Sequence, residues 1–304
     1  MKKLLTDDKI EGSQDLGDFI SGYSQELAMQ IYLKGKAHDK IIDSLLRMGD
    51  YERVLAYCQK VEYTPDYYDI FRKLCMVNPD SAVKYASKIH ENPETRIDPN
   101  TVIDLLVQGN LIKQVTAYLL DILKNDRPEE GALQTRLLEI NLTYSPIQVV
   151  DSILAQKLVN HYDRIKIARM CEKAQLFQRA LENYTDPADR KRVIVNTHAI
   201  NVEWLVKWFE DVSKQEVFMY LRELIKNKNN LQIVVKVATA NSSVLEPENL
   251  IPIFEEVKSN EGLYYYLGSI VNFSQDPQVH NKYIMAATRV NQLSEVERVT
   301  RDIS

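Results

Sequence analysis

Most prolines of this 304-residue chain stand directly after a small polar residue, and this arrangement limits the possible folds more than any other feature. Seven of the ten are found in the pairs Thr64-Pro65, Asn78-Pro79, Asn92-Pro93, Asp98-Pro99, Ser145-Pro146, Asp186-Pro187 and Asp276-Pro277. A small polar side chain caps the unpaired N–H groups at a helix start, and proline fits the next position because its missing N–H had no partner there. Six pairs precede apolar residues at helical spacing and predict helix starts. For Asn92-Pro93 a loop is the alternative.

The segments between these pairs have helical periodicity, and Ser213 with Glu216 predicts a further capped start. Apolar stripes are formed by Ile41, Ile42, Leu45 and Leu46, by Leu176, Phe177, Ala180, Leu181 and Tyr184, and by Tyr283, Ile284, Ala287 and Val290. Their i, i+3, i+4 spacing indicates amphipathic helices. Residues 231–238 are rich in Ile and Val but are predicted to form a buried helix. The sequence therefore predicts an all-α fold of about nineteen helices, each about 10 to 15 residues long, with short connections that make neighbours antiparallel.

Four predicted helix–turn–helix corners resemble one another, at residues 45–54, 105–114, 170–180 and 286–296. Their turn positions are Gly49, Gly109, Gln175 and Asn291, spaced by 60, 66 and 116 residues. Glycine suits a helix end because it adopts the left-handed conformation freely, whereas Asn tolerates it and Gln does so less well. The spacings approximate multiples of two helix pairs of about 30 residues, a repeat length typical of α-solenoids.

These repeats predict a right-handed α–α superhelix of stacked antiparallel helix pairs. About ten pairs at 8–10 Å per layer would give an elongated, curved rod of about 90–100 Å. No Gly/Ser tract, Pro-rich run or charge block interrupts the sequence. One continuous solenoid without flexible linkers is therefore expected.

Composition disfavours several classes of function. The net charge is −5, and the densest basic run, Arg190 to Arg192, is too short for a nucleic-acid footprint, so it is interpreted as a solvated helix face. Cys58, Cys75 and Cys171 are widely spaced and odd in number, which disfavours disulfides and zinc sites. The longest uncharged apolar stretch, residues 262–273, is too short for a membrane span. We expect a cytoplasmic chain without membrane insertion and without nucleic-acid binding.

No residue pattern predicts catalysis. The five histidines, His38, His90, His161, His198 and His280, form no metal-binding motif, and no nucleotide-binding glycine loop or nucleophile motif occurs. Asp186 and Asp189 are interpreted as a helix cap and a first-turn acid rather than an acid–base pair. We therefore assign no catalytic, cofactor-binding or metal-binding residue and expect a protein that is not an enzyme. A pH-sensing role of a histidine in assembly is left open.

Two aromatic clusters have both a structural and a functional interpretation. Trp204 and Trp208, four residues apart, are expected to fill space between helix pairs, and the alternative is a hot spot for peptide binding. Residues Tyr264, Tyr265 and Tyr266 cover three faces of one helix, so at least one ring should reach the surface. That ring is a candidate contact.

Longer stretches of the sequence resemble the clathrin heavy chain family. The strongest is GSIVNFSQDPQVH at residues 268–280, followed by Tyr283 and Ile284. Others are LLDILKNDRP at 119–128, LQTRLLE at 133–139, CEKA at 171–174, QRALE at 178–182, YTD at 184–186, EWLV at 203–206 and EVER at 295–298. Residues 1–110 match more loosely, with YTPD at 63–66 as the best anchor. The resemblance covers essentially the whole chain.

The resemblance implies a structural segment of a coat-forming leg. Residues 1–110 would be the end of the helical linker and the ankle, and residues 111–304 the distal leg. The expected partners are neighbouring heavy-chain legs in the polyhedral lattice of coated pits and vesicles, in endocytosis and intracellular transport, with a J-domain uncoating factor as a further partner. The segments for adaptors, light chains and trimerisation are expected to lie outside this chain, which should be a monomer.

Three alternatives remain at this stage: a helical-repeat subunit of a vacuolar or lysosomal tethering complex, a general peptide-binding solenoid and an enzyme with a scattered site. Gln175 and Asn291 stand where the family usually has glycine, and Val202 where it usually has proline after Asn201. These departures concern local turns and not the fold.

Overall fold

The computed structural model describes residues 11–303 except residues 49, 93, 94 and 96. Within this part of the chain it contains 21 α-helices, three short 3-10 helices and no strand. The all-α prediction is therefore confirmed, including the helix predicted at residues 231–238. No helix in the described ranges combines the length and apolar character that a membrane span requires.

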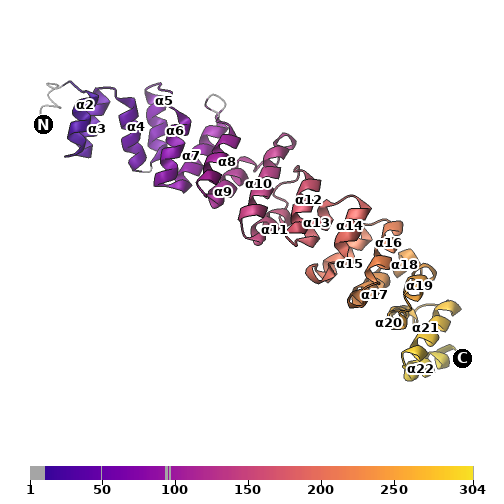
Figure 1. The fold of residues 1–304 in the computed structure, drawn as a ribbon. Helices are drawn as coiled ribbons and strands as arrows, with labels where there is room; N and C mark the ends of the chain where they lie inside the picture. The colour runs from indigo at the N-terminus through magenta and orange to yellow at the C-terminus, as the bar shows by residue number, and fades with distance from the viewer. Residues whose placement is uncertain (1–10, 49, 93–94, 96, 304) are drawn as a thin grey trace. The chain divides into compact units, whose positions relative to one another are not determined.

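The helices divide into two compact units, and the boundary in the sequence lies between residues 163 and 164. The first unit contains α2 (Gln14–Ser21), α3 (Gln25–Lys34), α4 (His38–Arg47), α5 (Tyr51–Lys60), α6 (Tyr67–Val77), α7 (Pro79–Glu91), α8 (Pro99–Gln108), α9 (Ile112–Ile122), η1 (Pro128–Glu130), α10 (Gly131–Tyr144) and α11 (Ile147–Ala155). In Figure 1 these helices follow one another from indigo to magenta in the order of the chain.

The second unit contains α12 (Arg164–Lys173), α13 (Phe177–Asn183), α14 (Pro187–Ile194), η2 (Thr197–Ala199), α15 (Val202–Glu210), α16 (Lys214–Leu224), η3 (Lys228–Asn230), α17 (Leu231–Ala240), α18 (Ser242–Leu245), α19 (Pro247–Glu256), α20 (Asn260–Ile270), α21 (Pro277–Arg289) and α22 (Leu293–Ile303). Its first helices are pink and its last are yellow in Figure 1.

Contacts between neighbours in the sequence define the architecture of both units. In the first unit α7 packs against α6, α5 and α9, and α4 packs against α3, α5 and α6. In the second unit α17 packs against α15, α16 and α20, and α21 packs against α20 and α22. Each helix thus covers the apolar faces of the helices that come shortly before and after it. This is the packing of a helical-repeat solenoid, and it confirms the predicted fold class.

The core of each unit is a series of layers, each filled by large side chains. The largest fully buried rings are Phe71, Tyr85 and Tyr118 in the first unit and Tyr184, Phe209, Tyr220, Phe254 and Tyr266 in the second. Burying one such side chain contributes about 1.5–3 kcal/mol relative to leaving it in water. Stability is therefore distributed along the chain and not concentrated in one centre.

Four of the predicted proline-marked starts are confirmed. The side chains of Asn78, Asp98, Asp186 and Asp276 accept hydrogen bonds from backbone N–H groups in the first turns of α7, α8, α14 and α21. Ser213 caps α16 in the predicted way: its Oγ accepts from the N–H of Glu216 at 3.4 Å and donates to the Glu216 carboxylate at 2.6 Å.

Two predicted helix starts are wrong, the one at Pro65 by two residues and the one at Pro146 by one residue. Helix α6 begins at Tyr67, because Asp66 and not Thr64 accepts the hydrogen bonds of its first turn. Helix α11 begins at Ile147, and the Ser145 hydroxyl instead donates to the side chain of Asn141 at 2.8 Å. Asn92 ends α7, and Pro93 lies outside the described residues.

Seven helix ends share one motif built on a non-glycine residue. Lys36, Glu62, Asn110, Lys157, Gln175, Lys258 and Asn291 have φ between 52° and 62°. In each case the next N–H donates to the carbonyl five residues earlier, at 2.8–3.2 Å, which satisfies a free carbonyl of the helix end. The left-handed conformation predicted for Gln175 and Asn291 is therefore confirmed.

The prediction for Gly109 is wrong. Its φ is −77°, and the left-handed residue is Asn110, whose short polar side chain tolerates this conformation. The residue of this corner that corresponds to Gln175 and Asn291 is therefore Asn110, one position after the glycine. Gly49 lies outside the described residues.

Candidate interaction surfaces

The ionisable side chains singled out in the sequence lie apart from one another in the part of the chain that the structure describes. In the described ranges no three His, Cys, Asp or Glu side chains lie close enough together to hold a metal ion. Asp186 caps α14, and Asp189 accepts from Arg192 at 2.6 Å, so the pair has the structural role predicted for it. The three cysteines are free, and burial raises the pKa of Cys75 to about 11, which keeps its thiol protonated at neutral pH.

The histidines are dispersed along the chain, and two of them fix local structure. His38 Nδ1 lies 2.7 Å from the Tyr57 hydroxyl, and its ring stacks on Tyr63 with centroids 4.7 Å apart. His280 Nε2 donates to the carbonyl of Ser274 at 2.8 Å. These contacts give both residues a structural explanation, and the pH-sensing role stays a prediction.

The basic run at residues 190–192 is partly solvated, as predicted, and it also forms ion pairs with other helices. Arg192 forms ion pairs with Glu172 of α12 at 2.8 Å and with Asp189 at 2.6 Å. Lys191 pairs with Glu223 of α16 at 3.0 Å. The sequence alone does not show the contacts with Glu172 and Glu223, because these partners lie 20 and 32 residues away on other helices. The run thus joins α14 to its neighbours.

The tryptophan pair packs between helices, as predicted. The rings of Trp204 and Trp208 stack with centroids 6.3 Å apart, and Trp208 lies 5.8 Å from Tyr220 of α16. The guanidinium of Arg190 lies over Trp208 at 5.6 Å. Both tryptophans are half-buried.

The three consecutive tyrosines point in different directions, and one reaches the surface. Tyr266 is fully buried and stacks on Phe254 at 5.5 Å, whereas Tyr264 stacks on Tyr283 at 5.6 Å. Tyr265 is 54% exposed, which confirms the expectation that one ring would be accessible.

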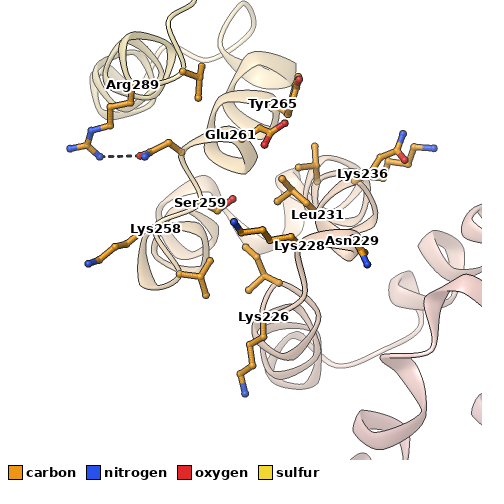
Figure 2. Close-up of a pocket in the computed structure, with 16 residues that line it drawn as sticks. Lys226, Lys228, Asn229, Leu231, Lys236, Lys258, Ser259, Glu261, Tyr265 and Arg289 are labelled. Carbon is orange, nitrogen blue, oxygen red and sulfur yellow. Dashed lines mark hydrogen bonds between the residues drawn. The ribbon is translucent and has the colours of Figure 1, made fainter.

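Tyr265 lines a groove of about 1160 Å³ in the second unit, called here the basic groove. Its walls are the end of α16, η3, the first turns of α17, the junction of α19 and α20 and the end of α21 (Figure 2). The lining residues are Ile225, Lys226, Lys228, Asn229, Leu231, Gln232, Val235, Lys236, Val257, Lys258, Ser259, Asn260, Glu261, Tyr265, Arg289 and Val290. Five carry a positive charge and one a negative charge.

A glycine allows the walls of the basic groove to come together. A Cβ added to Gly262 would lie 2.6 Å from Leu231 Cδ1 and 2.8 Å from Phe254 Cδ1. The first turn of α20 therefore approaches α17 and α19 more closely than another residue would allow. Ser259 caps this turn, and its Oγ accepts from the N–H of Gly262 at 3.2 Å.

A second accessible feature is the loop between α20 and α21, within the stretch that resembles the clathrin heavy chain family most strongly. Phe273 is 88% exposed, more than any other large apolar residue in the described ranges. Two hydrogen bonds to Ser274 hold the loop around it in place. The Ser274 hydroxyl accepts from the N–H of Asp276 at 3.2 Å, and the Ser274 carbonyl accepts from His280 Nε2 at 2.8 Å. An exposed aromatic ring on a fixed loop is suited to contact another protein.

The sequence analysis missed the basic groove. Lys228, Lys236 and Lys258 are far apart in the sequence and stand in no basic run. The only local signal is the polar turn at residues 226–230 between two apolar helices, which is also typical of an ordinary connection. The packing of the helices is what brings the charges together.

These features define a helical-repeat scaffold with interaction surfaces and no reaction centre in its described part. A family model described as the region in clathrin and VPS matches residues 92–233 and 238–304. The chain belongs to this clathrin repeat family. It is 45% identical over 303 residues to the clathrin heavy chain of Drosophila melanogaster, a match that covers 99% of this chain and 18% of that protein.

Other relatives have similar sequence identity and coverage. Clathrin heavy chain 2 of Homo sapiens is 42% identical over 306 residues, covering 100% of this chain and 19% of that protein. The probable clathrin heavy chain of Schizosaccharomyces pombe is 44% identical over 305 residues, covering 99% of this chain and 18% of that protein. The chain thus spans under a fifth of the length of the curated relatives that it matches.

Proposed function

We propose that this chain is a structural segment of a clathrin heavy chain leg and forms part of the polyhedral coat of vesicles. The observation that carries this proposal is that identity to clathrin heavy chains extends over 99% of the chain and coincides with a regular stack of helices. A tethering-complex subunit is not favoured, because the relatives at 41–45% identity are named as clathrin heavy chains.

In this role the chain works through shape and surface and has no catalytic step. It would lie beside the legs of neighbouring heavy chains on coated pits and vesicles in the cytoplasm. Each lateral contact would be weak, and the lattice would hold because many contacts act together. Weak single contacts also allow disassembly, for which a J-domain uncoating factor is the proposed partner.

The proposal includes one continuous solenoid, with residues 1–110 as the end of the linker and ankle and residues 111–304 as the distal leg. Small-angle X-ray scattering tests this. A continuous stack of about ten helix pairs should give a radius of gyration of about 30 Å. A compact globule of this length should give about 19 Å, and that value for a monomer would remove the structural basis of the leg.

The function is tested in the full-length heavy chain. We expect that deleting the segment corresponding to residues 111–304 prevents normal lattices on membranes while trimers still form. An intact heavy chain prepared in parallel is the control. Normal lattices formed by the shortened chain would contradict a structural role in the coat.

Phe273 provides a sharper test that leaves the leg at full length. Since the ring is 88% exposed, Phe273→Ser should change the stability of the chain by less than about 0.5 kcal/mol. We expect fewer assembled cages at equal heavy-chain concentration, because a contact repeated in every leg is lost. Exposed Met285, changed to Ser, is the control on the neighbouring helix α21. An equal effect of both variants would argue against a specific contact at Phe273.

A further inference from the structure

Four of the five cations that line the basic groove form no ion pair with a carboxylate of the described residues, and the fifth, Lys226, pairs with Glu223. No carboxylate of the described residues lies within ion-pair distance of Lys228, Lys236 or Lys258, and Arg289 donates only to the neutral side chain of Asn260, at 3.1 Å. All four side chains are exposed. These unpaired cations lie together in a chain whose net charge is −5.

The acidic residues around the groove have partners of their own, and only Lys226 of the lining cations is among those partners. Glu223 pairs with Lys191 at 3.0 Å and with Lys226 at 2.9 Å. Glu255 lies beside Lys282 at 2.5 Å, and Glu256 pairs with Arg222 at 3.2 Å. Only Glu261 of the lining residues remains as a negative charge. A ligand with several carboxylates would therefore find complementary charge on this surface.

Between the cations the groove offers apolar surface. Leu231, Val235 and Val290 are half-buried, and Val257 and Tyr265 are exposed by 39% and 54%. An apolar floor with polar groups around it is typical of recognition sites, where one large side chain provides an anchor.

The directions of the lysines indicate a long ligand and not a small one. Figure 2 shows Lys228 in the middle of the groove, directed toward Ser259, whereas Lys258, Lys226 and Lys236 project from three different margins. Cations that diverge in this way cannot converge on one phosphate group, but they can meet carboxylates spaced along a chain.

We propose that the basic groove binds an extended acidic peptide of a partner protein, in which carboxylates flank one large apolar side chain. The peptide would lie across α17 and the junction of α19 and α20, with its apolar side chain on Leu231 and Tyr265. This inference goes beyond the coat role and does not depend on it. A membrane surface is less suitable, since the groove is concave and its cations do not lie on one face.

A labelled synthetic peptide tests the proposal with the 304-residue chain. The probe is an octapeptide of Glu and Asp with Phe at a central position, and the readout is fluorescence anisotropy. The groove variant is Lys228→Glu with Lys258→Glu. The matched control is Lys207→Glu with Lys214→Glu, because these lysines of α15 and α16 are exposed, lie outside the groove and give the same change of net charge.

We expect saturable binding that salt weakens, a loss of about tenfold in affinity for the groove variant and little change for the control. Replacing the central Phe of the peptide with Ser should also weaken binding. Circular dichroism establishes that both variants are folded. Equal losses in the two variants, or no binding by the unmodified chain, would overturn the proposal. So would stronger binding to phosphatidylserine vesicles or to a single-stranded oligonucleotide than to the peptide.

Discussion

Arg192 of α14 holds Glu172 of α12 through two parallel hydrogen bonds, from Nε to Oε1 at 2.9 Å and from Nη2 to Oε2 at 2.8 Å. The same carboxylate accepts from the hydroxyl of Tyr184 at 2.7 Å, and Tyr184 is fully buried. One glutamate therefore joins two helices and the residue that ends α13. Paired charge-assisted bonds of this kind are stronger than single ones and fix the geometry of both partners.

Removing this carboxylate should destabilise the second unit. We expect Glu172→Ala to lower the free energy of unfolding by about 2 kcal/mol, because the Tyr184 hydroxyl loses its acceptor and Arg192 loses one of its two carboxylate partners. Glu172→Gln keeps an acceptor and should cost about 1 kcal/mol. Urea unfolding followed by circular dichroism measures both.

The control for this prediction is Glu297→Gln. Glu297 pairs with Arg301 at 3.9 Å, and both side chains are more than 70% exposed, so the loss should stay below about 0.5 kcal/mol. If the variants at positions 172 and 297 lost the same stability, the junction at Glu172 would have no special importance.

Acid should destabilise the second unit over a defined pH range. Hydrogen bonds from neighbouring groups hold the pKa of four glutamates below the ordinary value of 4.5: Glu172 (Arg192), Glu216 (Ser213), Glu223 (Lys226) and Glu295 (Arg298). Since their folded-state pKa is lower than the unfolded one, the unfolded chain takes up protons first. The stabilisation is complete above the unfolded pKa and is lost as the pH falls through the folded values.

The measurement is the urea midpoint from pH 7 downward, and the midpoint should fall once the pH drops below about 4.5. In Glu172→Gln the midpoint should start lower and decline less steeply, because one titrating group is gone. An identical decline in both proteins would show that Glu172 does not contribute to the acid sensitivity.

A pair of glycines offers a test of close backbone approach. A Cβ on Gly131 would lie 2.5 Å from the carbonyl oxygen of His161, although its φ of −55° suits any residue. Gly131→Ala should therefore destabilise the first unit by about 2 kcal/mol. At Gly22, with φ of −66°, the nearest atom is 3.9 Å away. Gly22→Ala should be neutral or stabilise by up to about 1 kcal/mol, and thermal unfolding that ranked the two variants the other way would contradict the steric argument.

The strained helix ends predict a substitution that stabilises the chain. Gln175 has φ of 62°, so Gln175→Gly should raise the free energy of unfolding by about 1 kcal/mol through relief of strain. The same change at Gln178, inside α13, should lower it by about 1 kcal/mol because glycine is a poor helix former. Chemical unfolding of both variants gives the comparison, and a loss of stability at position 175 would mean that the left-handed backbone carries no strain.

Local chemistry made the fold class predictable from the sequence. Small polar residues before proline, as at Asp98 and Asp276, mark helix starts because capping is a property of a few adjacent residues. Apolar stripes such as Ile41 to Leu46 also depend on a few nearby residues only, so their spacing shows which helix face is buried. The turn at Gly109 was misplaced by one residue because glycine and Asn110 both tolerate the left-handed conformation, and composition alone does not decide between them.

The interaction surfaces were less predictable, because they depend on how helices pack. The run at residues 190–192 is partly exposed as expected, but only the packing of α12, α14 and α16 shows that it pairs with Glu172 and Glu223. Lys228 and Lys258 share one groove only because η3 and the end of α19 lie together. Tyr265 was recognised as one of three candidates, but only the packing of α20 shows which ring is exposed.

The contacts of each helix with those shortly before and after it have a consequence during synthesis. A helix such as α7 makes its main contacts with α5, α6 and α9, so most of its apolar face is covered soon after α9 leaves the ribosome. Short sequence separations between partners favour rapid folding, and domains fold as units from the N-terminus while the chain is still growing. A long helical-repeat chain can then be made without ever exposing more than a few unfinished layers to aggregation.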